Sequence, residues 1–209
     1  MTDLSKTYLF RMTHIENIPH ILQHGITHLS SCNANPDFVP IGDRTLITTR
    51  NDFLLNNGRR LGDYIPFYFG VRTPMLYVIQ NGFNMVTPTP AENIVYCISS
   101  VQKIIEHKLD FVFTNGHAVD SFTTQYTPVD IVNIDNIIDQ KAVMAKYWRD
   151  ENDLDLDLKR RKEAEFLVLG DIPTEGVLGF LVYNQNALNR MIGFGVDTAT
   201  VHIKSSFYF

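Results

Sequence analysis

Residues 160–169 place a charged run directly before an apolar one, in the order Arg160-Arg161-Lys162-Glu163-Ala164-Glu165-Phe166-Leu167-Val168-Leu169. The apolar run has the length of a strand and is closed by Gly170-Asp171-Ile172-Pro173, so it is predicted to be a buried strand. Glu165 then lies at the lip of a hydrophobic element, where a carboxylate is costly unless the protein needs it there. The alternative is a solvated charge run that merely precedes a core strand.

The composition bounds the class of protein. The 209 residues are 44% hydrophobic and 20% charged, so we expect one sizeable core and a single domain over residues 1–209. No secretory leader or membrane-length apolar run is visible, and Cys32 and Cys97 are predicted to be free thiols, so we expect a cytoplasmic protein without membrane contact. The histidines and cysteines form no cluster at metal-ligand spacing, which predicts that no metal takes part. A net charge of -5 excludes a broadly basic nucleic-acid coat, so a nucleic-acid site must be a local positive groove on an acidic body.

Hydrophobic periodicity and turn residues predict the secondary structure. A helix is expected from about Ile15 to Gly25, with Asn17 as its cap, and further helices over 101–107 and 185–192. Strands are expected over 8–14, 94–98, 110–114, 166–169, 177–183 and 200–203. Residues 29–63 have no clean period, and 63–77 are dense in aromatic and β-forming residues punctuated by prolines. Many short strands with few helices favour an α+β fold with a split, mostly antiparallel sheet.

Several motifs occur together in a distinctive order. They are Arg11-x-Thr13-His14, Asn17-Ile18-x-x-Ile21-Leu22-x-x-Gly25, Asp63-Tyr64-Ile65-Pro66-Phe67-Tyr68-Phe69, Pro74-Met75-Leu76, Phe111-Val112-Phe113-Thr114-Asn115-Gly116-His117-Ala118 and Ala164-Glu165-Phe166-Leu167-Val168. In this order and spacing the sequence resembles the DarT family, the DNA ADP-ribosyltransferase toxins of bacterial toxin–antitoxin pairs. The resemblance runs from about Tyr8 to Phe209, and the aromatic block and the segment around His117 are its most specific parts.

The resemblance implies an ADP-ribosyltransferase fold, in which a split sheet holds NAD+ in a central cleft. Members of the family transfer ADP-ribose from NAD+ to a base in single-stranded DNA, thymine in one branch and guanine in another. It implies NAD+ as the substrate, single-stranded DNA as the acceptor, and a DarG-like macrodomain antitoxin that removes the modification. A monomer is expected.

The chemistry of this reaction agrees with the glutamate that the sequence places at the strand lip. Breaking the bond between nicotinamide and ribose builds positive charge on the sugar, and a fixed carboxylate stabilises that charge and can hold the 2′-hydroxyl. The resemblance assigns this catalytic role to Glu165. Glu163 lies two residues earlier, on the same face if the strand already includes it, and is not expected to be catalytic.

The resemblance also implies the residues that bind NAD+, namely Arg11, Met12, Thr13, His20 and Arg50. Arginine offers a rigid fork of donors to a pyrophosphate. Arg50 matches the catalytic arginine of the family's NAD+-covering loop, although Arg44 is the alternative because the alignment there is loose. Because a guanidinium is a poor proton acceptor, we expect Arg50 to act by electrostatic help.

The acceptor side is expected to involve His117, which lies on the loop leading toward the glutamate. A neutral imidazole can stack on a base or hydrogen-bond to it, whereas the alternative is a histidine that only ties down the turn. Arg59, Arg60 and Arg72 are predicted to bind DNA phosphates, unless they are simply solvated charges. Two other functions remain open: the same transfer to protein or RNA, and a non-catalytic module that binds nucleic acid.

Overall fold

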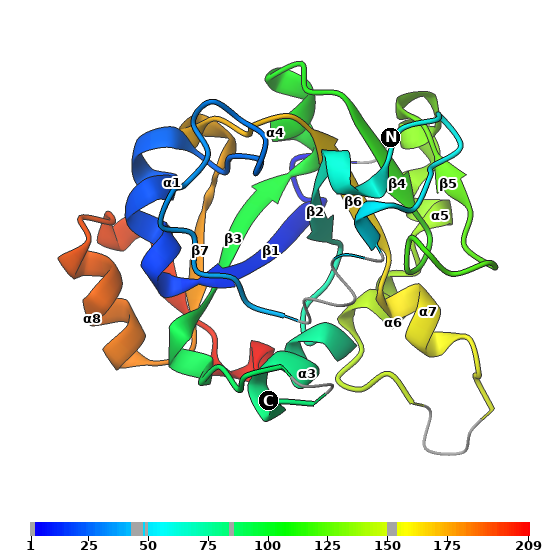
Figure 1. The fold of residues 1–209 in the computed structure, drawn as a ribbon. Coiled ribbons are helices and arrows are strands. Elements are labelled where there is room, and N and C mark those ends of the chain that lie inside the picture. The colour runs from blue at the N-terminus through cyan, green and yellow to red at the C-terminus, as the bar shows by residue number, and fades with distance from the viewer. Residues whose placement is uncertain (1–2, 43–47, 49, 84–85, 150–153) are drawn as a thin grey trace.

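The structure is a computed structural model that describes residues 3–42, 48, 50–83, 86–149 and 154–209. The strands of these residues form one eight-stranded sheet in the order β5-β4-β6-β2-β1-β3-β7-β8 (Figure 1). Their bounds are β1 Tyr8–His14, β2 Tyr64–Tyr68, β3 Ile94–Ser100, β4 Phe111–Thr114, β5 Gln125–Tyr126, β6 Glu165–Leu169, β7 Gly179–Val182 and β8 Val201–Ile203. Neighbouring strands are antiparallel except β7 and β8, which are parallel. The fold is therefore α+β with a mostly antiparallel sheet, as predicted.

The helices surround this sheet. Their bounds are α1 Ile18–His24, α3 Pro74–Asn81, α4 Val101–Glu106, α5 Ile134–Ile137, α6 Gln140–Met144, α7 Leu158–Lys162 and α8 Gln185–Gly193. Short 3-10 helices span Ile15–Asn17, Leu61–Asp63, Ala91–Asn93, Pro128–Asn133, Thr174–Gly176, Thr198–Thr200 and Ser205–Phe207. In Figure 1, α1 and α8 lie at one side, α6 and α7 at the other, and α3 at the bottom close to the C-terminal end. None of the helices in the described ranges is long and apolar enough to cross a membrane.

The sheet is split between its two central strands. β1 pairs with β3 over its whole length, and β2 pairs with β6 over its whole length. Between β1 and β2, however, the register contains one pair, Phe10 with Tyr68. Because the two strands diverge beyond this pair, each half of the sheet keeps its own backbone partners and a cleft opens between the halves.

The pleat of β2 sorts its aromatic block between core and cleft. Phe67 is fully buried in the main hydrophobic core, and Phe69 joins it there beyond the strand end. Tyr64 and Tyr68, which alternate with Phe67, line the cleft. The register with β6 also places Tyr68 opposite Glu165. β2 therefore contributes side chains both to the hydrophobic core and to the wall of the cleft.

Four of the described helices, α3, α5, α6 and α7, were not expected from the sequence. The segment from Pro74 continues the aromatic block in composition, yet it forms α3, because Thr73 accepts a hydrogen bond from Leu76 N and Gly82 ends the helix in a left-handed conformation. The cationic run before Glu165 forms the short helix α7. Glu163 ends that helix and is not part of β6, so the strand alternation considered above does not apply to it.

Candidate active site

A cleft of about 510 Å³ occupies the split in the sheet. All five residues predicted to contact NAD+ line it, namely Arg11, Met12, Thr13, His20 and Arg50. The segment after α1 forms one wall through side chains that include His28, Phe38 and Ile41, and β2 forms another through Tyr64 and Tyr68. The sequence therefore identified residues from distant segments that the fold brings to one cavity. Arg44, the alternative to Arg50, lies outside the described residues.

Arg50, which lines this cleft, forms an ion pair with Glu165, which is not among the described lining residues. Arg50 Nη2 lies 2.6 Å from Glu165 Oε2, and Arg50 Nη1 lies 3.1 Å from Oε1. The Glu165 side chain is fully buried and the Arg50 side chain is 15% exposed. Burial alone raises the pKa of the Glu165 carboxyl, but the Arg50 guanidinium outweighs burial and holds that pKa below its usual value. The carboxylate is therefore ionised and fixed in one geometry.

The backbone around Glu165 fixes it further. Its carboxylate Oε1 accepts a hydrogen bond of 2.9 Å from Ala118 N, and its own N–H donates to Thr114 Oγ1 at 3.1 Å. Thr114 ends β4, which pairs with β6, and its hydroxyl also donates to Gly116 O at 2.7 Å. The turn that follows β4 is thus built onto the first residue of β6. The sequence predicted this turn and the strand separately, but it carried no local signal that the Glu165 carboxylate of the strand accepts a hydrogen bond from the turn.

His117 lies on that turn, against the ion pair. Its Nε2 is 3.3 Å from Arg50 Nη1. Because a guanidinium only donates, Nε2 must accept, and the ring is assigned the tautomer with its proton on Nδ1. Burial lowers the pKa of His117, so the imidazole is neutral at neutral pH. The backbone N–H of His117 donates to the backbone carbonyl of Arg160 at 3.1 Å, which ties the turn to α7. The residue therefore ties down the turn and also contacts the ion pair of Arg50 and Glu165.

Arg11 spans the split itself. It projects from β1, and its Nη1 donates to Pro66 O on β2 at 3.0 Å. Burial lowers the pKa of the Arg11 guanidinium, although arginine remains charged at any physiological pH. A cation thus lies in the cleft at the point where the two halves of the sheet diverge.

Two polar residues that the sequence interpretation did not assign to the site shape the cleft wall. Asn17 was expected to cap α1, but its side chain instead forms a two-way clamp on Val39, donating to Val39 O and accepting from Val39 N, both at 2.8 Å. Asp171 accepts from His28 N at 2.7 Å and from Ser31 Oγ at 2.5 Å. These contacts hold the irregular segment after α1 against the body of the protein, and no local pattern in the sequence predicts them.

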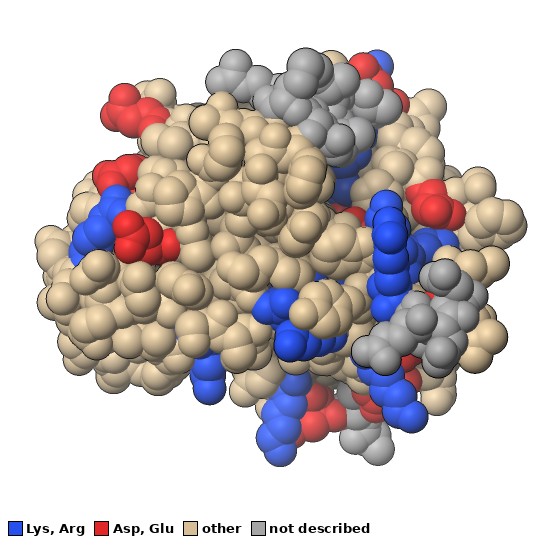
Figure 2. Space-filling view, turned by 90° about the horizontal axis from the view of Figure 1, so that it is seen from below, with Lys and Arg blue, Asp and Glu red and all other residues tan. Residues whose placement is uncertain are grey.

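The three arginines predicted to contact DNA lie outside the cleft lining. Arg60 is exposed and pairs with Asp52, with Nη1 and Oδ1 2.7 Å apart. Arg59 is exposed beside it. Arg72 instead uses its guanidinium to bind the backbone carbonyls of Lys146, Ser206 and Tyr208, so these contacts give it an anchoring role. Seen from below, Lys and Arg side chains do gather in the middle and on the right of Figure 2, with some Asp and Glu side chains among them.

Glu163 is a second acidic residue near the pair. It is 9% exposed. Burial raises its pKa to about 7, with Lys159 lowering it and the Glu165 carboxylate raising it further. Its protonation therefore changes within the physiological range, next to a carboxylate that stays ionised.

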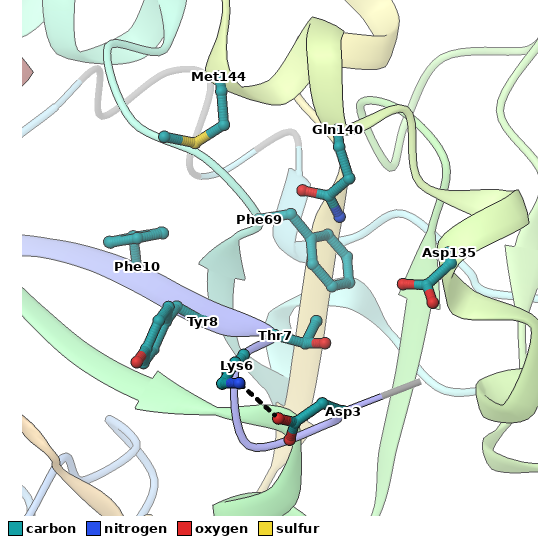
Figure 3. Close-up of a pocket in the computed structure, with 9 residues that line it drawn as sticks. All are labelled: Asp3, Lys6, Thr7, Tyr8, Phe10, Phe69, Asp135, Gln140 and Met144. Atoms are coloured by element: carbon teal, nitrogen blue, oxygen red, sulfur yellow. Dashed lines mark ion pairs between the residues drawn. The ribbon is translucent and has the colours of Figure 1, made fainter. Parts of the chain in front are cut away.

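A second hollow, of about 270 Å³, shares no lining residue with the cleft. Figure 3 shows Lys6, the one cation among the described residues that line it, paired with Asp3, and their ion pair is 3.2 Å long. Its other polar lining groups include Thr7, Asp135 and Gln140. Because Arg11 and Arg50 both lie in the larger cleft, that cleft is the better receptacle for a pyrophosphate. Among the residues with described positions, no three His, Cys, Asp or Glu side chains form a group suited to a metal ion.

A carboxylate at the start of a central strand, held by an arginine of the cleft that divides the sheet, is the arrangement that the sequence led us to expect of an NAD+-dependent ADP-ribosyltransferase. A family model described as "ssDNA thymidine ADP-ribosyltransferase, DarT" matches residues 10–209. The chain therefore belongs to the DarT family and is a DNA ADP-ribosyltransferase, which confirms the resemblance seen in the sequence.

Individual relatives agree with this assignment. A DNA ADP-ribosyl transferase of Escherichia coli O127:H6 is 31% identical over 209 residues, which cover 98% of this chain and 94% of that protein. A fusion of a DNA ADP-ribosyl transferase with a DNA ADP-ribosyl glycohydrolase, from Thermosipho africanus, is 32% identical over 77% of this chain and 38% of the fusion.

Two solved structures have the same fold. Thermus sp. 2.9 DarT in complex with ADP-ribosylated ssDNA has a TM-score of 0.80 and 28% identity, over 97% of this chain and 96% of that one. The same protein in complex with NAD+ has a TM-score of 0.76 and 28% identity, over 97% and 98%. NAD+ as substrate and single-stranded DNA as acceptor, both expected from the sequence, are thus confirmed for the family.

Proposed function

We propose that the cleft binds NAD+ with its pyrophosphate near Arg11 and its nicotinamide ribose near Glu165. The observation that carries this assignment is the fixed, ionised carboxylate that Arg50 holds at the cleft. Arg11 supplies a second cation in the same cavity, at the split between the sheet halves. Met12, Thr13 and His20 line the same cavity and would contact the dinucleotide between the two charged positions.

The hydrogen bonds of Glu165 leave one acceptor site of its fully buried carboxylate unused among the described groups. A carboxylate has about four lone-pair sites. Oε1 accepts from both Arg50 Nη1 and Ala118 N, whereas Oε2 accepts from Arg50 Nη2 alone among the described groups. The remaining site on Oε2 suits the 2′-hydroxyl of the nicotinamide ribose. From there the carboxylate opposes the positive charge that develops on the sugar.

The transfer step is balanced without a further reactant. A ring nitrogen of the acceptor base forms a bond to the anomeric carbon of the ribose, while the bond from that carbon to nicotinamide breaks. Nicotinamide leaves as a neutral molecule with the bonding electron pair, and the ring N–H proton of the base passes to solvent water. Arg50 stays protonated, since the Glu165 carboxylate raises its pKa despite burial, so it stabilises negative charge on the base rather than accepting the proton.

We infer that the acceptor is thymine in single-stranded DNA, in agreement with the family's description. His117 supports this inference, because a neutral imidazole beside Arg50 is placed to hydrogen-bond to a base that enters the site. A paired base in a duplex would have to be flipped out at a cost of about a few kcal/mol, whereas a single strand offers it directly.

We also propose a partner that reverses the modification. The support is the Thermosipho africanus fusion, in which a transferase similar to this chain is joined to a DNA ADP-ribosyl glycohydrolase. A DarG-like macrodomain protein would fill this role for the present chain. The test is co-expression: such a partner should remove ADP-ribose from DNA that this protein has modified.

The decisive experiment incubates the protein with labelled NAD+ and separate pools of single-stranded DNA, duplex DNA, RNA and protein. Label is expected in single-stranded DNA that contains thymine and not in an otherwise equal strand that lacks it. Label in a thymine-free strand with guanine would assign guanine as the acceptor. Label confined to RNA or protein would assign the reaction to another acceptor, and hydrolysis of NAD+ without any labelled pool would contradict the proposal.

A further inference from the structure

A cluster of aromatic and basic side chains covers the face beside α3. Tyr77 packs against Phe83, Trp148 and Phe209, with ring centroids 5.5, 5.2 and 5.2 Å away. Trp148 also packs edge-on against Phe209 at 5.8 Å. We call this group, together with the residues Arg72, Lys146 and Tyr147, the aromatic–basic surface.

Cations flank the aromatic rings on this surface. Arg72 Cζ lies 4.0 Å from the Phe209 ring centroid and 5.8 Å from that of Tyr147. Lys146 Nζ lies 5.4 Å from the Tyr147 centroid. Tyr147 is 56% exposed and Phe83 is 50% exposed, so two large rings remain accessible to solvent. Exposed rings beside positive charges are what a single strand of nucleic acid requires, since bases stack on the rings and phosphates approach the cations.

The surface is held rigidly. Arg72 has a φ of 53°, which is rare for a residue other than glycine, and it donates from Nε to Lys146 O at 3.1 Å. The buried Lys162 donates from Nζ to Val71 O at 3.0 Å and to Ala145 O at 2.5 Å. These bonds join the segment before Tyr147 to the turn before α3 and to α7.

The same bonds relate the surface to the active site. Lys162 precedes Glu165 by three residues, and Val71 follows Tyr68, the strand partner of Glu165, by three. α3 itself separates the two regions, because Met75 and Ile79 line the cleft while Tyr77 belongs to the aromatic–basic surface. The surface is therefore a few residues of chain away from the catalytic carboxylate, along two independent connections.

We propose that the aromatic–basic surface binds the nucleotides that flank the modified base, with Tyr147 as the stacking platform. This inference rests on the proposed transfer to single-stranded DNA. Charge favours this occupant: the protein as a whole is acidic, yet Arg72 and Lys146 lie against the rings of this surface, and Lys and Arg gather, with some Asp and Glu among them, on the face seen in Figure 2. Flanking nucleotides held here would raise affinity without contributing to the chemistry, and they would contact the protein through base stacking that tolerates any sequence.

The tryptophan of this surface provides a direct test, because Trp148 is the one tryptophan in the chain. Its fluorescence should change when a thymine-containing oligonucleotide with several flanking nucleotides is titrated in, and should not change with a minimal oligonucleotide that fills the active site alone. An emission that stays constant while the long oligonucleotide is bound and labelled would overturn the proposal.

Variants supply the second test. Tyr147→Ala should lower affinity for the long oligonucleotide by about tenfold, from the loss of one stacked base, while Tyr147→Phe should retain it. Labelling of the minimal oligonucleotide and hydrolysis of NAD+ should stay at the wild-type rate. Lys103→Ala, on α4 at the opposite end of the molecule from α3, is the matched control (Figure 1). It should leave the affinities for the long and the minimal oligonucleotide unchanged.

The outcomes separate this proposal from the proposed function. If the wild-type protein labels no single-stranded DNA, the proposed function fails. If it labels DNA and Tyr147→Ala weakens the long and minimal oligonucleotides equally, or neither, then the flanking site is wrong while the function stands. Loss of binding to a DarG-like partner with unchanged DNA affinity would instead assign the surface to that protein and overturn the proposal.

Discussion

Arg50 and Glu165, which are 115 residues apart in sequence, meet through two parallel hydrogen bonds of 3.1 and 2.6 Å. Burying two charges costs several kcal/mol per ion, so such a pair is not by itself a source of stability. Its consequence is positional: the carboxylate has one orientation, and the charge of Arg50 keeps it ionised inside the protein. A group that must oppose charge at one atom of a substrate gains most from this kind of preorganisation.

Glu165→Gln should abolish most of the transfer activity while preserving the shape of the side chain. An amide cannot oppose the developing positive charge, and removing one preorganised electrostatic group typically lowers the rate by roughly 10²–10³. The rate of label transfer to single-stranded DNA measures the effect, and Glu175→Gln at an exposed carboxylate is the control. Wild-type transfer by Glu165→Gln would refute the assignment of this residue.

Arg50→Ala should shift the pH dependence of transfer. Without the guanidinium, burial is the main influence on Glu165, so the folded-state pKa of its carboxyl rises. In the wild-type protein the folded pKa lies below the unfolded value of 4.5, so the stability that the ionised carboxylate contributes is present above pH 4.5 and is lost as pH falls through the folded pKa. In the variant the carboxyl takes up its proton at a higher pH and loses the charge that the transfer needs. The acidic limb of the rate profile should therefore move to higher pH in the variant.

Arg50→Lys serves as the comparison in the same experiment. Lysine keeps the positive charge but cannot form the two parallel bonds of the guanidinium. Its acidic limb should lie closer to wild type than that of Arg50→Ala, although its maximal rate should be reduced by looser positioning. Identical pH profiles for wild type and Arg50→Ala would show that Arg50 does not control the ionisation of Glu165.

Arg59→Ala should weaken DNA labelling more than it weakens NAD+ hydrolysis in the absence of DNA. Arg59 is exposed outside the cleft lining, so it is available to a phosphate, whereas its neighbour Arg60 is engaged with Asp52. Loss of one phosphate contact should also reduce the salt dependence of DNA binding by about one unit of slope. Arg60→Ala should have the smaller effect of the two. Equal loss of both activities in Arg59→Ala would place this arginine in the NAD+ site.

The sequence predicted the parts of the site that have local signals. The switch from charge to an apolar run predicted a strand over 166–169 with Glu165 at its lip, and in the structure Glu165 is the first residue of β6. The family spacing predicted the cleft residues that include Arg11 and Arg50. It could not predict contacts between distant segments. Asn17 was predicted to cap α1 because it directly precedes that helix in the sequence. Its side chain instead hydrogen-bonds to the backbone of Val39, 22 residues away. The helix α3 was missed because aromatic composition was given more weight than the capping signals of Thr73 and Gly82.

Glu163 provides the last prediction, which concerns stability rather than activity. Burial raises its folded-state pKa to about 7 from an ordinary value of 4.5. Between these values the folded protein holds a proton that the unfolded chain has released, so its contribution to stability is complete below pH 4.5 and is lost as pH rises through about 7. The shift corresponds to about 3 kcal/mol at most. The groups that face it are Lys159, Asp120, Arg50 and Glu165.

Glu163→Gln removes this titration while keeping a side chain of the same size, so the variant should gain stability over wild type as pH rises from 5 to 8. Urea unfolding at several pH values gives the difference in unfolding free energy. Glu106→Gln, at an exposed helix position, is the control, because Lys103 lowers the pKa of that carboxyl and its loss should not reproduce a gain between pH 5 and 8. A difference between Glu163→Gln and wild type that stays constant across this range would mean that Glu163 is not the buried, protonated carboxyl that its environment indicates.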